Sequence, residues 1–191
     1  MTLKILNAGL LMLAAALASG CAADASESDD HDHDLAADEE IVDIDESALT
    51  YPAMDVPYKC GVTVIGSTWA AHNPLKAIDF RLPSGSRVDA SAAGTVSYGN
   101  LGTASYGKYL VINHGNGWST RYAHLSQATV TSGHVTRGQP IGVSGDSGKA
   151  AGAPHLHYEQ IHNGVVVPIK LAGSVDPGYP DTKYTYSGGC N

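Results

Sequence analysis

Two histidines near the C-terminal end of the chain stand one residue apart in the run GAPHLHYEQIHNG. In a β-strand, successive side chains alternate between the two faces, so His155, His157 and Glu159 would share one face. The Cα atoms of His155 and His157 would then lie roughly 6 to 7 Å apart, twice the rise per residue of a strand. Both imidazoles could therefore serve one metal-centred site, one as a ligand and the other in proton transfer.

The segments that must position these histidines are short, rich in β-forming residues and separated by clusters of Gly, Asn, Ser and Asp. No segment shows a sustained helical period. Gly-Asn-Gly between two of the β-rich runs predicts a hairpin over residues 108–124. The predicted strands lie within residues 86–90, 94–99, 108–114, 118–125, 140–145, 154–162 and 164–169.

This pattern predicts an all-β domain over residues 57–170, mostly antiparallel, followed by an irregular C-terminal tail at residues 171–191. Cys60 stands near the start of this domain and Cys190 near the end of the tail that follows it. In an oxidising compartment they are natural disulfide partners, and the link would stabilise the fold by roughly 4 to 5 kcal/mol. The alternative is a pair of buried thiols.

The first 21 residues have the composition of an export signal. Lys4 precedes a short apolar run and then small residues, and the run is too short to span a bilayer. The sequence LASGC resembles a bacterial lipobox, in which Cys21 becomes the lipidated first residue of the mature protein. Ordinary signal-peptidase cleavage nearby is the alternative. We expect export to the cell envelope, with a lipid anchor at a membrane through Cys21 or, failing that, secretion.

The net charge of −8 conceals two regions of opposite sign. Residues 22–56 contain thirteen acids and no Lys or Arg, whereas residues 57–191 contain ten Lys or Arg against six acids, a net +4. A like-charged segment that is poor in aromatic residues buries too little apolar surface to offset its chain entropy. Residues 22–56 are therefore predicted to be an acidic disordered tether, and the domain to be mildly cationic.

Four strings resemble the LytM/lysostaphin-type zinc metallopeptidases in their order and approximate spacing: HNPLKAIDF, YLVINHGNGWSTRYAHLS, RGQPIGVSGDSG and GAPHLHYE. Together they cover residues 60 to about 165. The resemblance implies an open sheet or sandwich of the duplicated hybrid motif type, with a zinc site in a groove. It also implies cleavage of short peptide bonds in bacterial cell walls.

Carried over residue by residue, the resemblance implies that His72, Asp79 and His157 are the metal ligands. His124 and His155 match the two catalytic histidines of the family that do not bind the metal. The chain departs from the family at one point. Many members place the first histidine four residues before the aspartate, where this chain has Leu75, whereas His72 lies seven residues before Asp79.

The chemistry of these residue types agrees with that assignment. Two imidazoles and one carboxylate leave a fourth position for water, as in catalytic zinc sites, where zinc lowers the pKa of water toward ~7 and polarises a carbonyl. His124 and His155, with ordinary pKa values near ~6.5, suit the proton transfers of amide hydrolysis. If residues 121–125 form a strand, Tyr122 shares a face with His124 and could donate to the oxyanion, although it could equally be a packing aromatic.

We therefore predict an exported zinc metalloendopeptidase that hydrolyses cross-link or stem-peptide bonds of peptidoglycan by zinc-activated water. One alternative is a catalytically silent LytM-like module that binds the cell wall and activates other hydrolases. Another is a cupin-type metal protein, although cupins carry their histidine pair early in the barrel, whereas here it closes the domain. We expect a monomer with peptidoglycan as its partner, and no nucleic-acid partner.

Overall fold

The computed structural model describes residues 49–172 and 182–186. Within these residues all regular structure is β, apart from one short 3-10 helix, and no helix there is long and apolar enough to cross a membrane. The strands are β1 Val64–Thr68, β2 Ile78–Phe80, β3 Arg87–Asp89, β4 Gly94–Asn100, β5 Lys108–Gly115, β6 Trp118–Ala123, β7 Leu125–Ala128, β8 Ser132–Val135, β9 Pro140–Ser144, β10 Leu156–His162, β11 Val165–Val167 and β12 Thr182–Tyr186.

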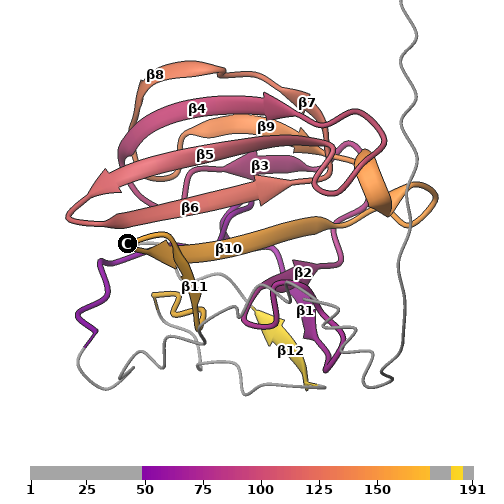
Figure 1. Ribbon diagram of the computed structural model, residues 1–191, viewed down its shortest axis with the longest axis horizontal. Helices are drawn as coiled ribbons and strands as arrows, with labels where there is room; N and C mark the ends of the chain where they lie inside the picture. The colour runs from indigo at the N-terminus through magenta and orange to yellow at the C-terminus, as the bar shows by residue number, and fades with distance from the viewer. Residues whose placement is uncertain (1–48, 173–181, 187–191) are drawn as a thin grey trace, which may run out of the picture. The chain divides into compact units, whose positions relative to one another are not determined.

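The strands form two antiparallel sheets. The larger has nine strands in the order β12-β1-β2-β10-β6-β5-β4-β8, with β11 also paired to β10, and the smaller has the order β3-β9-β7. Figure 1 shows β10 crossing the middle of the large sheet, with β6, β5 and β4 on one side and β2, β1 and β12 on the other. The predicted all-β, mostly antiparallel fold is confirmed.

The predicted hairpin is also confirmed, because β5 and β6 pair from Leu110 opposite Tyr122 to Gly115 opposite Trp118. Asn116 adopts a φ of 51° and Gly117 a φ of 78° in the turn, the left-handed conformations that Asn and Gly adopt most readily. The hairpin brings β6 against β10, where Arg121 lies opposite Glu159 and Ala123 opposite His157.

β10 shows the predicted alternation of faces. Leu156 and Tyr158 are fully buried in the hydrophobic core, between the two sheets and against β2 and β6. His157 and Glu159 point to the other face, where their side chains are hydrogen-bonded to each other. One face of this strand therefore supports the core and the other carries ionisable groups.

The C-terminal region differs from the predicted irregular tail. Thr182–Tyr186 forms β12, which pairs with β1 along its full length, from Val64 opposite Tyr186 to Thr68 opposite Thr182. Its sequence, TKYTY, contains β-branched and aromatic residues, which favour a pleated strand.

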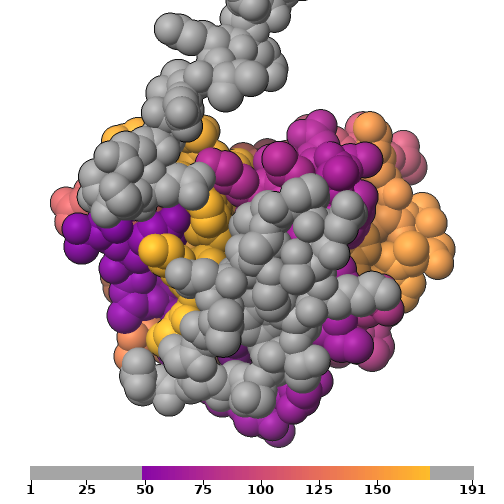
Figure 2. All heavy atoms as spheres, turned by 90° about the horizontal axis from the view of Figure 1, so that it is seen from below, coloured from indigo at the N-terminus to yellow at the C-terminus, as the bar shows by residue number. Residues whose placement is uncertain are grey.

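The structure also moves the start of the domain. Residues 49–56, which the charge pattern assigned to the acidic tether, lie in the described part of the chain, and Met54 and Val56 are buried in the core. Asp55 is buried as well and pairs with Arg137 Nε at 3.4 Å. The backbone N–H of Ala172 donates to the carbonyl of Met54, and Figure 2 shows the indigo N-terminal residues beside the yellow-orange C-terminal ones. The rest of the predicted tether and the export signal lie outside the described residues.

Candidate metal centre

Three predicted metal ligands converge at the boundary between β2 and β10. Asp79 on β2 lies directly opposite His157 on β10, and His72 comes from the loop between β1 and β2. Asp79 Oδ1 lies 3.2 Å from His72 Nε2 and 2.9 Å from His157 Nδ1. One ligand atom from each residue lies within 4.8 Å of the others, and all three residues are buried. The seven-residue spacing of His72 and Asp79 is thus compatible with a shared site.

In each of the two histidine rings, the nitrogen that does not face Asp79 is hydrogen-bonded to another acceptor. His72 Nδ1 lies 3.0 Å from the carbonyl of Ala77, and because a carbonyl only accepts, this nitrogen carries the proton. His157 Nε2 lies 3.0 Å from Glu159 Oε1 and donates in the same way. Each neutral ring therefore offers its other nitrogen, with a free lone pair, beside the Asp79 carboxylate. Such a His₂Asp set, oriented by second hydrogen bonds, fits a zinc ion.

The electrostatics of the centre also favour a cation. Burial opposes charge on His157, but its hydrogen bonds to Asp79 and Glu159 raise its pKa to about 9. Burial likewise opposes charge on Asp79, yet its contacts with His157 and His72 hold the pKa of this carboxyl well below its usual range. Without a metal, a proton therefore lies between His157 and Asp79 at neutral pH. Metal binding would displace this proton and place positive charge at the same point.

His124 lies beside this centre but outside the three-ligand group. Its φ of 61° ends β6 and turns the chain into β7. The backbone N–H of His124 donates to the carbonyl of Tyr106, and its ring Nδ1–H donates to the carbonyl of Ser147 at 2.8 Å. Burial lowers the pKa of His124 to about 4, so its ring is neutral at pH 7, with Nε2 as its basic nitrogen.

His155 also lies beside the centre, immediately before β10. Its backbone forms an isolated antiparallel bridge with Gly145, and its ring Nδ1–H donates to the carbonyl of Ala153 at 2.8 Å. His155 Nε2 lies 3.4 Å from Asp79 Oδ2, the carboxylate oxygen that faces away from His157 Nδ1. The histidine pair therefore serves a single centre, as the alternation in the sequence predicts.

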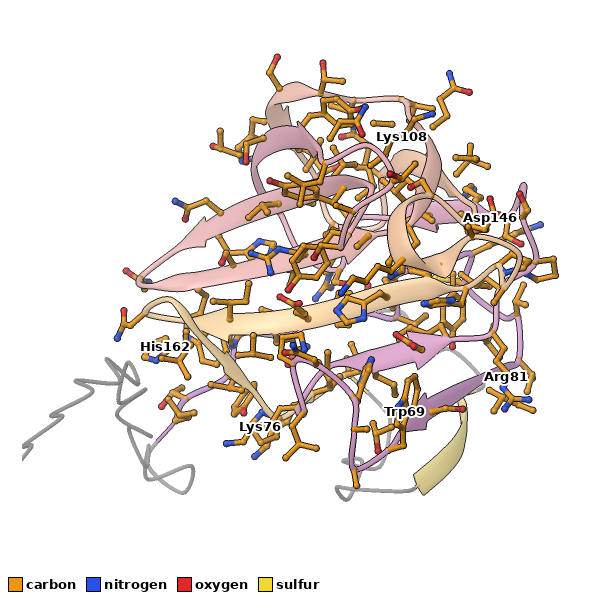
Figure 3. All side chains as sticks on the ribbon, turned by 45° about the vertical axis from the view of Figure 1, so that its right-hand side comes forward. Trp69, Lys76, Arg81, Lys108, Asp146 and His162 are labelled. Carbon is orange, nitrogen blue, oxygen red and sulfur yellow. The ribbon has the colours of Figure 1, made fainter. Side chains whose placement is uncertain are left out.

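The centre opens onto a groove of about 800 Å³. Figure 3 shows Trp69 and Arg81 on one side of β10, and Asp146 in the loop on the other side. Trp69 is 40% exposed and its ring lies 4.3 Å from the ring of His72. Arg81 and Lys149, both exposed, also line the groove. Apart from the Asp79 centre, the charged groups of the described groove lining are therefore cationic.

Tyr122 is a packing aromatic, the alternative to the oxyanion role that the sequence left open. It is fully buried in the core, where its hydroxyl accepts hydrogen bonds from the backbone of Ser91 and from Thr120 Oγ1, each at 2.9 Å. The tyrosine that lines the groove is Tyr106, whose hydroxyl donates to Glu159 Oε1 at 2.8 Å. Tyr106 lies in the loop between β4 and β5, where no sequence period marks it.

Two further predicted sites involve residues that the structure does not describe. Cys21, the predicted lipidation site, and Cys190, the predicted partner of Cys60, both lie outside the described residues. Lipidation and the Cys60–Cys190 disulfide therefore stay predictions.

Comparison with known proteins finds similarity in the part of the chain that contains Asp79, His124 and His157. The model of peptidase family M23 matches residues 73–169. The chain is 39% identical over 126 residues to the DD-carboxypeptidase/endopeptidase Mpg of Neisseria meningitidis, a match that covers 65% of this chain and 28% of that protein. It is 46% identical over 95 residues to the peptidoglycan DD-endopeptidase ShyA of Vibrio cholerae, covering 48% of this chain and 21% of that protein. The chain thus spans about a quarter of the length of these curated relatives.

Solved structures agree on the fold. A putative peptidase M23 from Pseudomonas aeruginosa superposes with a TM-score of 0.51 and 30% identity, covering 62% of this chain and 49% of that one. The catalytic domain of the prophage-encoded M23 protein EnpA from Enterococcus faecalis gives a TM-score of 0.50 and 26% identity, covering 58% of this chain and 92% of that domain.

Proposed function

The chain belongs to peptidase family M23, and we propose from this premise that it is a zinc metalloendopeptidase that hydrolyses peptide bonds of bacterial peptidoglycan. The observation that carries the proposal is the buried group of His72, Asp79 and His157, whose free ring nitrogens face one carboxylate oxygen. When bound there, zinc would activate a water molecule and polarise the scissile carbonyl.

His124 and His155 are suited to the proton transfers of amide hydrolysis. The carbonyls of Ser147 and Ala153 hold the proton of each ring on Nδ1, so each neutral ring keeps a basic Nε2. Nε2 of one ring can take a proton from the attacking water, and the imidazolium formed can then supply that proton to the departing amine, directly or through Nε2 of the other ring. Burial favours the neutral form of His124, so its Nε2 is unprotonated at neutral pH.

The groove supports a thin, extended and partly anionic substrate. Its described lining contributes the exposed ring of Trp69 and the cations Arg81 and Lys149, and the peptide stems of peptidoglycan carry carboxylates. The name of the relative ShyA, a peptidoglycan DD-endopeptidase, points to the same polymer. We also propose export, because residues 1–21 have the composition of a secretory signal and Cys21 stands where a lipid anchor would be attached.

Zinc content and wall digestion together test the function. Full-length protein should contain one zinc per chain and release peptides from purified peptidoglycan, and a chelator should stop the release until zinc is restored. His157→Ala should abolish both zinc binding and release. Stoichiometric zinc without any released peptide would contradict an endopeptidase and favour the catalytically silent wall-binding module.

A further inference from the structure

Beside the metal centre, one buried carboxylate accepts hydrogen bonds from three side chains. Glu159 has no exposed surface, and its Oε1 accepts from His157 Nε2 at 3.0 Å and from the Tyr106 hydroxyl at 2.8 Å. Its Oε2 accepts from Arg121 Nη1 at 2.7 Å. A fully buried carboxylate is stable only when it is paired and hydrogen-bonded, and three donors satisfy this requirement here.

The position of Glu159 follows from the sheet. Glu159 is two residues from His157 on β10, so both side chains emerge on the same face. Arg121 lies opposite Glu159 on β6, and its guanidinium also lies 4.5 Å from the centre of the Tyr106 ring. The strand register therefore brings His157 and Arg121 to the same buried carboxylate, and the loop between β4 and β5 adds Tyr106.

We propose that Glu159 is a positioning residue for the metal centre, which keeps the proton of His157 on Nε2 and so directs the free Nδ1 toward Asp79. This inference rests on the proposed zinc-dependent function. A histidine bonded to an acceptor through one nitrogen binds metal through the other, and the acceptor also fixes the orientation of the ring. Through Tyr106, the same carboxylate holds one wall of the groove against the metal centre.

Glu159→Gln tests the role because it nearly preserves shape but replaces one oxygen by an N–H₂ group. If the amide oxygen faces Arg121, the N–H₂ group faces His157 Nε2, which must then accept, and the ring proton moves to Nδ1. If the amide is turned round, two donors oppose each other at Arg121. The first arrangement removes the His157 tautomer that binds metal, and the second keeps it only at the cost of opposed donors at Arg121.

The matched control is Asp89→Asn. Asp89 is also a buried carboxylate paired with an arginine, since its oxygens accept from Arg87 at 2.7 and 2.6 Å, but it lies on β3 in the other sheet. Both variants neutralise a buried acid beside an arginine, so both should lower the melting temperature of the metal-free protein. Only the Glu159 variant should weaken zinc binding.

Zinc affinity is measured by competition with a chromophoric chelator, on metal-free full-length protein whose folding is first checked by circular dichroism. We expect Glu159→Gln to lower the affinity by about 10- to 100-fold, the usual effect of losing such a partner, and Asp89→Asn to leave it within about threefold of wild type. In ¹⁵N-histidine spectra of the zinc-loaded wild type, His157 should carry its proton on Nε2. Unchanged affinity in Glu159→Gln, or an equal loss in Asp89→Asn, would overturn the role.

A second variant keeps the test open if Glu159→Gln does not fold. Glu159→Asp retains the charge beside Arg121 but is one methylene shorter, so it should bind zinc more weakly than wild type, and equal affinity would count against the proposal. Wild-type protein that binds zinc tightly but cleaves no peptidoglycan would refute the proposed function and leave the Glu159 result standing. Wild-type protein without zinc would overturn both.

Discussion

His124 and His155 face each other beside the metal centre, with ring centroids 4.7 Å apart and ring planes inclined at 64°. The two residues are 31 positions apart and belong to different strand ends, yet each is tied through Nδ1–H to a backbone carbonyl of the same loop, Ser147 or Ala153. Their Nδ1 partners distinguish these two rings from that of His157, whose Nδ1 is directed at Asp79.

His124→Ala and His155→Ala should each retain stoichiometric zinc but lower kcat by about 10²- to 10⁴-fold, the usual contribution of a positioned acid or base. His157→Ala should instead lose the metal. Zinc measured by atomic absorption on the purified variants, alongside peptide release from peptidoglycan, separates the two classes. Equal zinc loss in His155→Ala and His157→Ala would contradict the assigned roles.

His72 is the proposed ligand with the unusual spacing, and its own test is metal binding. Its Nδ1–H donates to the carbonyl of Ala77 and its Nε2 faces Asp79, so His72→Ala should remove one of three protein ligands and abolish tight zinc binding. His134→Ala is the control, because His134 is exposed on β8. Chelator competition on both proteins gives the comparison, and tight zinc in His72→Ala would require another first ligand.

The sequence predicted local relations between site residues but not the long-range ones. The period of two placed His155, His157 and Glu159 on one face because that relation is local. Pairing of Asp79 with His157 spans 78 residues and depends on the register of β2 against β10, so only the family resemblance connected them. β2 itself was missed because it has three residues, all buried, and therefore shows no alternation.

The sequence left two roles open for Tyr122, and the structure shows the packing role. The oxyanion role required a regular strand through His124, but the positive φ of His124 ends β6 there and breaks the alternation. No periodic sequence pattern marks Tyr106, because it lies in a loop whose position at the groove depends on the tertiary structure. The charge pattern likewise assigned Asp55 to the tether. In the structure Asp55 is buried in the domain, where it forms an ion pair with Arg137.

The two tyrosines should respond differently to loss of the hydroxyl. Tyr106→Phe removes a donor that lines the groove, where burial, reinforced by Glu159, raises the pKa of Tyr106 to about 12 and keeps it protonated at neutral pH. We expect lower kcat/KM with zinc retained. Tyr122→Phe leaves the backbone N–H of Ser91 without its acceptor, so it should cost about 1 to 3 kcal/mol of stability and leave kcat/KM of the folded protein near wild type. Chemical denaturation and peptide-release assays measure the two effects, and the reverse pattern would restore Tyr122 to the site.

The segment before residue 57 should prove to be part of the folded domain. Met54 has no exposed surface and packs in the core, so Met54→Ala should destabilise the protein by about 2 to 5 kcal/mol. Val62→Ala is the control, since Val62 is 41% exposed and its truncation should cost less than about 0.5 kcal/mol. Urea unfolding at fixed zinc concentration gives both values. A protein shortened to begin at residue 57 should be less stable than Met54→Ala, and equal stability to the full chain would show that the segment does not contribute.

His114 predicts an acid-sensitive step in stability that is separate from the metal centre. It lies outside the groove lining, where its Nδ1–H donates to the carbonyl of Ala93 at 2.8 Å, and burial lowers the pKa of its ring below the ordinary value. Below about pH 6.5, the unfolded chain therefore binds a proton at this position more readily than the folded chain, and the free energy of unfolding falls as the pH is lowered.

His114→Asn should reduce this pH dependence, because an amide can still donate to Ala93 but does not titrate. The measurement is the free energy of unfolding at several pH values between 5 and 7.5, for wild type and variant at saturating zinc. Contributions from the metal centre should cancel in the difference, since distant sites are close to additive. His134→Asn, on an exposed strand position, should leave the slope unchanged. A wild-type slope that survives in His114→Asn would place the titrating group elsewhere, whereas a flatter slope would identify the half-buried ring of His114 on β5 as its source.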